Sequence, residues 1–390
     1  MKIVIKSIKV MLLPNNKQRT KLFQSAGTAR WAYNWTLAKQ QENYKNRGKF
    51  ISDGELRKEL TQIKKTDEFK WLNSYSNNIT KQSIKDACLA YQRFFKHQAD
   101  FPKFKSKRKS TPSFYVDNCV IEFSETHVKL EKLTDSRKFN KQKLNWIKLA
   151  EKNRIPLTCK YYNPRVTFDG VNFWISVGVD CEVNTGQPIN DGIGIDIGIK
   201  DFAICSDGNT YKNINKTKQV KILKKKKCRL QRKVSRKYLK NKKGECYCKT
   251  RNIIKSEKEI LKLNHRLTNI RHNYLHQTTS EIINRKPMFI VLEDLNVKGM
   301  MKNRHLAKAV QEQCFYEFYK QIKYKSEWNN IRFIEADRYF PSSKLCSVCG
   351  NIKSDLKLSD RTYICDCGNV IDRDYQAALN LAEYGRKLIA

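Results

Sequence analysis

Two runs of apolar residues in the second half of the chain lack polar alternation, a pattern typical of strands buried on both faces of a parallel sheet. They span 193–199 and 289–295 and are rich in Ile, Val and Leu, and β-branched residues favour strands. Asp196 lies within the first run, and Glu293 lies near the end of the second. Because a charge in such a run is costly unless something compensates it, both acids are candidate functional residues. A further strand is predicted at 332–336.

Helical spacing of apolar residues predicts five longer helices. The segment 216–243 combines scattered apolar residues with many Lys and Arg, which predicts a helix with a thin apolar stripe and a very basic outer face. The alternative for such a charge run is a solvated or disordered segment. The predicted helices lie within 17–46, 56–63, 80–98, 216–243 and 253–283.

Alternating patterns in the first half predict strands at 2–12, 113–123, 127–130 and 165–179, the last of these around a turn at Asp169-Gly170. These strands are sufficient to close a small β-barrel, with the first three helices inserted into it. The segment 184–188, Asn-Thr-Gly-Gln-Pro, is the expected boundary to the second half. The chain is therefore expected to be a multidomain α/β protein.

Composition favours a polyanionic partner. The 390 residues include 78 Lys and Arg against 38 Asp and Glu, for a net charge of +40, and a basic excess of this size is typical of nucleic-acid binding. A segment at 101–110, in which Lys and Arg alternate with Phe, predicts a strap that contacts nucleic acid, with a solvated linker as the alternative. No apolar run approaches the about 20 residues of a membrane-spanning helix. The N-terminus also lacks the apolar core of a signal peptide, so the expected location is the cytoplasm, with the nucleoid.

A third carboxylate precedes a helical pattern near the C-terminus. Asp374 comes before Ala378, Leu381 and Ala382, which would share one side of a helix, so we expect it at the N-cap or in the first turn. Asp372 is the alternative third acid. Two acids from strands and one from a helix start can converge on divalent metals, and oxygen ligands suit Mg²⁺ and Mn²⁺.

Convergence of these acids would imply bound cations. Three carboxylates within about 5 Å of one another would repel by roughly 3 kcal/mol per pair at an effective dielectric near 20. Two metal ions in one site activate a water and stabilise the leaving alkoxide during phosphodiester hydrolysis. Asp196 taken by itself fits two further roles, because an acid at a strand end can cap a turn and Asp-x-Gly also holds a magnesium nucleotide in sugar-kinase and actin-like folds.

Four of the 13 cysteines form two close pairs, Cys346-x2-Cys349 and Cys365-x-Cys367. Two such pairs indicate a zinc ribbon, because a tetrahedron of thiolates suits Zn²⁺. A redox-active pair is the alternative. The remaining cysteines are expected to be small buried hydrophobic residues, and the pair in 246–248 is interpreted as incidental.

The second half thus carries three acidic motifs and two cysteine motifs. This set resembles the TnpB (OrfB) family, which comprises insertion-sequence-encoded RNA-guided nucleases related to type V CRISPR effectors. The family usually has Asn at the position of Gln376, which concerns the local hydrogen bonding at the third acid. The motifs are 194–198, 292–295, Cys346-x2-Cys349-Gly350, Cys365-x-Cys367-Gly368 and 372–374.

The resemblance implies an RNA-guided DNA endonuclease. Asp196, Glu293 and Asp374 would be the catalytic ligands of Mg²⁺ or Mn²⁺ in an RNase H-like (RuvC) core. The expected partners are a noncoding guide RNA from the same element and a double-stranded DNA target, with a monomer bound to the guide. A transposase that acts directly on element ends and a nuclease-silent regulator are the rival functions.

The resemblance also implies a domain order. A β-barrel wedge domain would hold a helical recognition insert, and a zinc ribbon would interrupt the nuclease core before its final helix. The expected domains are 1–15 and 105–185 for the wedge, 16–104 for the insert, 186–342 and 371–390 for the core, and 343–370 for the ribbon.

Overall fold

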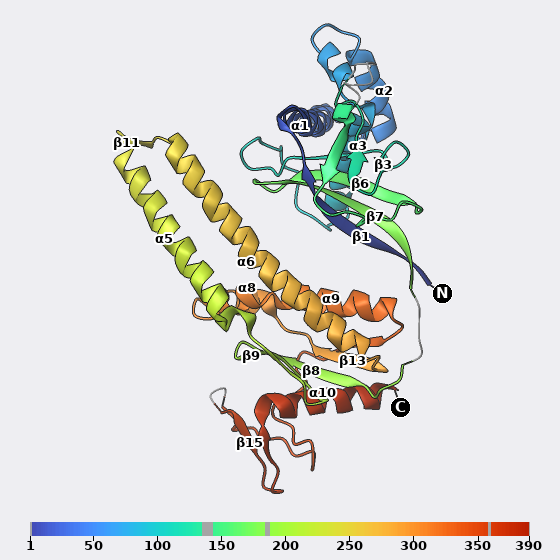
Figure 1. The fold of residues 1–390 in the computed structure, drawn as a ribbon. Coiled ribbons are helices and arrows are strands. Elements are labelled where there is room, and N and C mark those ends of the chain that lie inside the picture. Colours follow the sequence, from blue (N-terminus) through green and yellow to red (C-terminus); the bar gives the residue numbers. More distant parts are fainter. Residues whose placement is uncertain (1, 135–142, 184–187, 358–359, 390) are drawn as a thin grey trace. The chain divides into compact units, whose positions relative to one another are not determined.

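The computed structural model describes residues 2–134, 143–183, 188–357 and 360–389 (Figure 1). The chain forms two compact units, Ile3–Cys181 and Glu182–Ala390, the second of which also includes Met1–Lys2. Most of the predicted boundary segment, 184–187, lies outside the described residues. Among the described helices none is both long and apolar enough to cross a lipid bilayer.

The N-terminal unit is built on a seven-stranded sheet in the order β2-β6-β7-β1-β5-β4-β3. Pairing is antiparallel from β2 through β6 to β7 and from β1 through β5 and β4 to β3. Alternate residues of β7 are buried, as the sequence pattern predicts. Among the described residues β2 and β3 are the two edge strands of this sheet, with no pairing between them. Closure of the sheet into a barrel therefore stays a prediction. The strands are β1 (Lys2–Leu13), β2 (Ser113–Tyr115), β3 (Glu122–Phe123), β4 (His127–Lys129), β5 (Trp146–Leu149), β6 (Tyr161–Phe168) and β7 (Phe173–Val183).

The predicted strand at 113–123 is wrong in its middle. The Asp117 side chain accepts a hydrogen bond from the backbone N–H of Cys119 at 2.9 Å, and its carbonyl accepts one from Ile121 at 3.0 Å. Such Asp-centred turns compete with a strand ladder. The segment therefore forms two short strands, β2 and β3, joined by a turn.

Three helices of this unit lie where helical spacing predicts them: α1 (Asn16–Lys45), α2 (Asp53–Ile63) and α3 (Asn77–Phe95). Capping boxes begin α1 and α2. Trp31 and Trp35 stack with ring centroids 6.3 Å apart and pack against a buried cluster that includes Leu56 and Leu60. These tryptophans therefore serve as core anchors.

The second unit contains a five-stranded sheet in the order β10-β9-β8-β13-β14. Strands β8, β13 and β14 run parallel, and β9 pairs antiparallel with β8. This mixed sheet with flanking helices confirms an α/β fold (Figure 1). The strands are β8 (Ile193–Ile197), β9 (Asp201–Cys205), β10 (Thr210–Lys212), β13 (Phe289–Glu293) and β14 (Arg332–Ala336).

Both faces of β13 are buried, as its continuous apolar run predicts. Ile290 and Leu292 join a core with α6 and α9, whereas Phe289 and Val291 pack on the other face with Leu381 of α10. The helices of this unit are α5 (Lys218–Lys240), α6 (Arg251–Asn284), α7 (Val297–Met300), α8 (Ala307–Gln313), α9 (Phe315–Trp328) and α10 (Arg373–Ile389).

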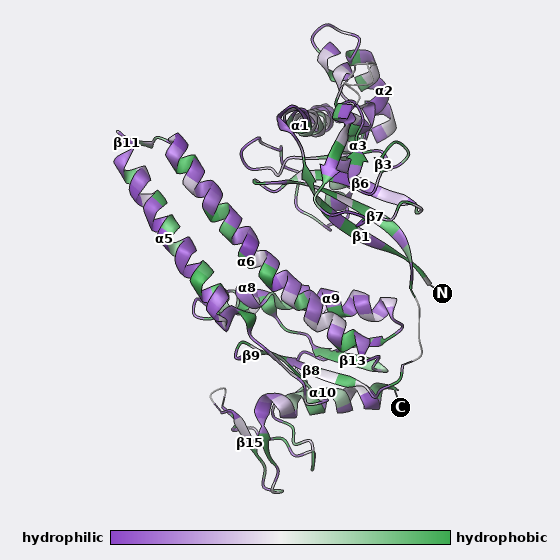
Figure 2. Cartoon of the chain, viewed as in Figure 1, coloured by the Kyte–Doolittle hydropathy of each residue, from purple (hydrophilic) through white to green (hydrophobic). Residues whose placement is uncertain are grey.

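Helices α5 and α6 pack along each other through a narrow apolar seam. Val220 and Leu223 of α5 contact Leu263 and Leu267 of α6. The rest of α5 is dominated by Lys and Arg, and Figure 2 shows it as a mostly hydrophilic helix with few apolar positions. The predicted helix with a thin apolar stripe and a basic outer face is therefore confirmed.

Helix α10 lies unusually close to the sheet because small residues line the contact. A Cβ atom added at Gly194 of β8 would come within 2.2 Å of the Ala378 carbonyl oxygen and 2.4 Å of the Ala382 amide nitrogen. At Gly385 an added Cβ would lie 2.3 Å from the Phe289 ring. Glycine is thus required at both positions, and the start of α10 is held close to the end of β8.

We therefore expect Gly194→Ala to destabilise the second unit by about 1–3 kcal/mol, because the methyl group meets backbone atoms that cannot rotate away. Chemical denaturation followed by circular dichroism measures this. Gly27→Ala is the matched control, because nothing lies within 4 Å of its added Cβ inside α1 and the exchange should add about 0.5–1 kcal/mol of helix stability. Equal effects of the two substitutions would contradict the close packing of α10.

Candidate functional site

Asp196 and Glu293 lie at the carboxyl ends of two neighbouring parallel strands, Asp196 as the next-to-last residue of β8 and Glu293 as the last residue of β13. Ile195 of β8 and Leu292 of β13 are register partners, and the two acids are the next residue on each strand. Adjacent strands lie about 4.8 Å apart, so the acids share one edge of the sheet. Ligands bind at this carboxyl edge in open α/β sheets.

Strand alternation also sends both acids toward the same face. Side chains two residues apart lie on one face of a strand, so Asp196 shares the face of Gly194, against which α10 packs. Glu293 likewise shares the face of Phe289 and Val291, which belong to the cluster with α10. The third candidate acid lies at the start of that helix.

The two acids at the start of α10 have different roles. The Asp372 carboxylate accepts hydrogen bonds from the backbone N–H groups of Asp374 and Tyr375 at 3.0 and 3.1 Å, and therefore caps the helix. Asp374 lies in the first turn, and its carboxylate is not used for capping. It accepts hydrogen bonds from the guanidinium of Arg373, at 3.1 Å for the closer one, and lies 3.8 Å from Arg361.

The electrostatics of Asp196 depend on the other two acids. Burial raises the pKa of its carboxyl well above the usual range, and the nearby carboxylates of Glu293 and then Asp374 raise it further. Burial also raises the pKa of Glu293, against the lowering effect of a hydrogen bond from Ser342. Such raised pKa values mark a site where additional positive charge would be stabilising.

The three acids are therefore neighbours, but they are not as tight as a preformed metal cage. Among the described residues, only the four cysteines form a group of metal-binding side chains whose ligand atoms lie within 4.8 Å of one another. Asp374 pairs with two arginines instead. Three carboxylates near one sheet edge are nevertheless oxygen donors that suit hard divalent cations such as Mg²⁺.

A buried polar network that the sequence did not reveal positions Glu293. The Ser342 hydroxyl donates a hydrogen bond to Oε1 of Glu293. Nδ2 of Asn380, on α10, donates to the carbonyl oxygens of Ser342 and Leu345 at 2.7 Å each. The sequence carries one signal for this network: two polar residues, Gln376 and Asn380, are spaced by four among the apolar residues of α10. Both side chains are buried in the structure.

Gln376 links the same helix to the cysteines. Its side chain is fully buried, and it donates to the carbonyl of Leu345 at 2.7 Å and accepts from the Ser347 hydroxyl at 3.0 Å. Both partners lie next to Cys346. The residue that departs from the usual Asn of the resembling family thus joins the helix of the third acid to the first cysteine loop.

The four predicted cysteines lie together. The Sγ atoms of Cys346 and Cys367 are 3.7 Å apart, and those of Cys349 and Cys365 are 3.6 Å apart. Each sequence pair is followed by a glycine with positive φ, Gly350 at 76° and Gly368 at 88°. Gly350 precedes the hairpin formed by β15 (Thr362–Ile364) and β16 (Val370–Asp372), and Gly368 lies in the turn between these two strands. Glycine tolerates this conformation at no steric cost.

This cluster fits a tetrahedral thiophilic ion. Although burial opposes it, hydrogen bonds from the backbone of Cys349 and the side chain of Asn369 lower the pKa of the Cys346 thiol to about 6. Metals bind the thiolate form. Four sulfur ligands in a compact group, with none of the described cysteines in a disulfide, favour a metal site such as Zn²⁺ over a redox pair. The pair Cys246 and Cys248 belongs to no such group.

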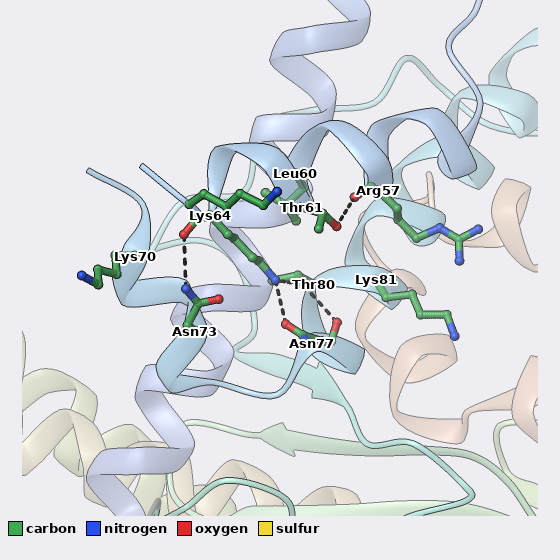
Figure 3. A pocket seen from close by; sticks show the side chains of 10 residues that line it. Arg57, Leu60, Thr61, Lys64, Lys70, Asn73, Asn77, Thr80 and Lys81 are labelled. Carbon is green, nitrogen blue, oxygen red and sulfur yellow. Dashed lines mark hydrogen bonds between the residues drawn. The ribbon is translucent and has the colours of Figure 1, made fainter. Parts of the chain in front are cut away.

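A second candidate site is a basic pocket of about 570 Å³ in the N-terminal unit, between α2 and α3 (Figure 3). Lys64 lies inside it and donates to Asn77 at 2.9 Å and to Thr80 at 3.2 Å. Burial and the nearby charge of Lys132 lower the pKa of Lys64. Exposed cations surround it: Lys65, Lys70 and Lys81.

Family models match most of this architecture. The OrfB_IS605 model, described as "Probable transposase", matches residues 176–304. The TNB domain of Cas12f1-like proteins matches 315–381, which includes the cysteine cluster and the start of α10. A model described as a helix-turn-helix domain of OrfB_IS605 proteins matches 1–49, where the structure has the strand β1 followed by the single long helix α1.

Relatives match over nearly the whole chain. A protein of Streptomyces pristinaespiralis, provisionally named an RNA-guided DNA endonuclease, is 27% identical over 98% of this chain and 90% of its own length. InsQ of Escherichia coli K12, provisionally named in the same way, is 28% identical over 99% of this chain and 94% of its own.

A solved structure has the same fold. The Cas12f1 chain in a complex with sgRNA and target DNA matches 94% of this chain and 82% of its own length, with a TM-score of 0.59 and 14% sequence identity. The motifs, the cysteine cluster, the family models and the full-length relatives agree. Over nearly its whole length the chain is therefore similar to OrfB_IS605 proteins and to proteins named RNA-guided DNA endonucleases, in agreement with its resemblance to the TnpB (OrfB) family.

Proposed function

We propose that this protein is an RNA-guided DNA endonuclease whose active site comprises Asp196, Glu293 and Asp374. The observation that carries the proposal is their placement: two acids lie at the carboxyl ends of neighbouring parallel strands, on the face that α10 covers, and the third lies in the first turn of α10. This arrangement supports an RNase H-like (RuvC) core. The names of the full-length relatives support the same activity.

The chain's own residues would hold and orient the reacting groups. Bound Mg²⁺ or Mn²⁺ would activate a water and stabilise the leaving oxygen of the phosphodiester. Asp196 and Glu293 would supply ligands from the rigid sheet, and Ser342 would fix the orientation of the Glu293 carboxylate. Asp374 pairs with Arg373 and Arg361. When the metal ions bind, its carboxylate would leave these arginines and ligate the ions instead.

The positive charge of the chain would bind the guide and the target through their phosphates. The basic face of α5 and the pocket between α2 and α3 supply this charge on separate units. Base pairing with a guide would then select the target, while the protein reads the backbone. Nothing in these basic surfaces distinguishes RNA from DNA.

We expect Asp196→Asn, Glu293→Gln and Asp374→Asn each to lower DNA cleavage at least about 10³-fold, because each removes a charge needed to hold the metal ions; this equals roughly 4 kcal/mol of transition-state stabilisation. Cleavage of a supercoiled plasmid by the protein with its copurified RNA measures this. Asp372→Asn is the matched control, since Asn also caps helices well and activity should remain.

The same assay separates the rival functions. Loss of activity in Asp372→Asn but not in Asp374→Asn would reassign the third ligand. Cleavage of element ends by protein free of RNA would favour the transposase. A wild-type protein that binds its target with Mg²⁺ present but never cleaves it would favour the regulator.

We also propose that Cys346, Cys349, Cys365 and Cys367 bind one structural Zn²⁺, which contributes on the order of 10 kcal/mol to local folding. Elemental analysis should find one zinc ion per chain, and Cys349→Ser should lose it. Cys228→Ser, at an exposed cysteine of α5, is the control and should keep the metal. A zinc-free protein with intact cysteines and unchanged thermal stability would contradict this site.

We further expect the basic pocket of Figure 3 to contact phosphates. Replacing Lys65 and Lys81 by Gln should weaken nucleic-acid binding uniformly across sequences and reduce the slope of log K against log salt by about 1 per lost contact. The control replaces exposed Lys152 and Lys160, which changes the net charge equally. If both double variants shift the slope alike, the pocket makes no specific phosphate contact.

A further inference from the structure

An aromatic pocket of about 690 Å³ lies in the N-terminal unit, where α1 and α3 end. It is separate from the basic pocket, with which it shares no residue. Six of its lining residues are aromatic and none is aliphatic. They are Tyr44, Phe50, Tyr91, Phe94, Phe95 and Phe101.

Several of these rings are exposed. The exposed fractions are 77% for Tyr44, 55% for Phe95, 47% for Phe101 and 40% for Phe50. Large exposed apolar patches on soluble proteins commonly mark binding sites. Neighbouring rings meet mostly edge to face, with centroids 6.1 Å apart for Phe50 and Phe95 and 5.2 Å apart for Phe94 and Phe101, so flat ring faces remain available.

One buried polar group in this pocket is unsatisfied. Tyr91 is only 4% exposed, and its hydroxyl makes no hydrogen bond within the described part of the chain. The Gln41 side chain, which also lines the pocket, lies beside it without reaching hydrogen-bonding geometry. Buried polar groups normally have partners, so this hydroxyl indicates that a ligand with hydrogen-bonding edges completes the site. The Phe50 and Phe95 rings that contact Tyr91 would rotate to admit it.

The charges around the pocket restrict what this ligand can be. Lys45 lines the pocket, and exposed Arg47, Lys49 and Lys96 lie at the ends of the same two helices. A polyanion therefore suits the rim. Inside, the carboxyl ends of α1 and α3 disfavour an isolated anion, whereas an uncharged, flat ring system with polar edges suits the aromatic lining.

We propose that this aromatic pocket binds an unstacked nucleobase of a single RNA or DNA strand whose phosphates lie along the basic rim. A base stacks on aromatic rings without regard to its identity, and its edge would supply the partner that the Tyr91 hydroxyl lacks. The inference rests on the proposed function only in requiring a nucleic-acid partner.

The test measures binding of 12-nucleotide RNA and DNA oligonucleotides that carry one 5-iodouracil, in buffer without added Mg²⁺ or Mn²⁺ and without a chelator, so that cleavage is suppressed and the proposed zinc site is kept. Crosslinks induced by light should map by mass spectrometry to the pocket residues. Phe95→Leu removes a stacking ring and should weaken binding about five- to one-hundred-fold. Tyr162→Leu, at an exposed ring of β6 outside the pocket, is the control and should bind normally.

A second variant separates binding from packing. Tyr91→Phe removes the unpartnered hydroxyl, so thermal stability should stay the same or rise, whereas affinity should fall about two- to tenfold. The RNA and DNA arms show which strand supplies the base. Unchanged affinity of folded Phe95→Leu and Tyr91→Phe, or crosslinks only outside the pocket, would overturn the proposal.

Three further outcomes separate this inference from its alternatives. If Phe95→Leu abolishes self-association of the protein without affecting either oligonucleotide, the pocket holds a second copy of the chain and the proposal is wrong. A protein that crosslinks through the pocket but never cleaves DNA would contradict the proposed endonuclease function while leaving this inference standing. Normal DNA cleavage together with crosslinks only outside the pocket would overturn this inference while leaving the proposed endonuclease function standing.

Discussion

The structure of the candidate active site depends on the close approach of α10 to the sheet. Gly194 and Gly385 leave no room for a larger side chain at this contact, so the helix and the strand are fixed at backbone distance. Because Gly194 and Asp196 share one face of β8, the same contact brings the first turn of α10, with Asp374, to the edge where Asp196 and Glu293 lie. Small residues with no chemistry of their own thus position three acids from distant parts of the sequence.

The loop that leads into the cysteine cluster links α10 to Glu293. Gln376 and Asn380 of α10 hold the loop that precedes Cys346, and Ser342 of that loop holds Glu293. A metal ion on the four thiolates would therefore stiffen both the helix of the third acid and the support of the second. A zinc ribbon would thus position the proposed catalytic acids as well as stabilise its own fold.

The sequence predicted those parts that local pattern determines. Strand β14 has the predicted bounds, both faces of β13 are buried as its apolar run requires, and the cysteine spacing predicted the cluster of four thiols that could hold a metal ion. The break after β2 was missed because the Asp117 turn outweighs β propensity. Ser342, Asn380 and the unpartnered Tyr91 hydroxyl were also missed, since their partners are set by tertiary packing and leave little trace in the local sequence.

The central claim is that Asp196, Glu293 and Asp374 together bind divalent ions. An anomalous difference map from crystals soaked in Mn²⁺ tests it most directly. The account predicts two peaks, roughly 3.5–4 Å apart, ligated by these three carboxylates, with Asp374 released from Arg373 and Arg361. Full occupancy of Mn²⁺ elsewhere, with the three acids still apart and Asp374 still paired to arginine, would contradict it.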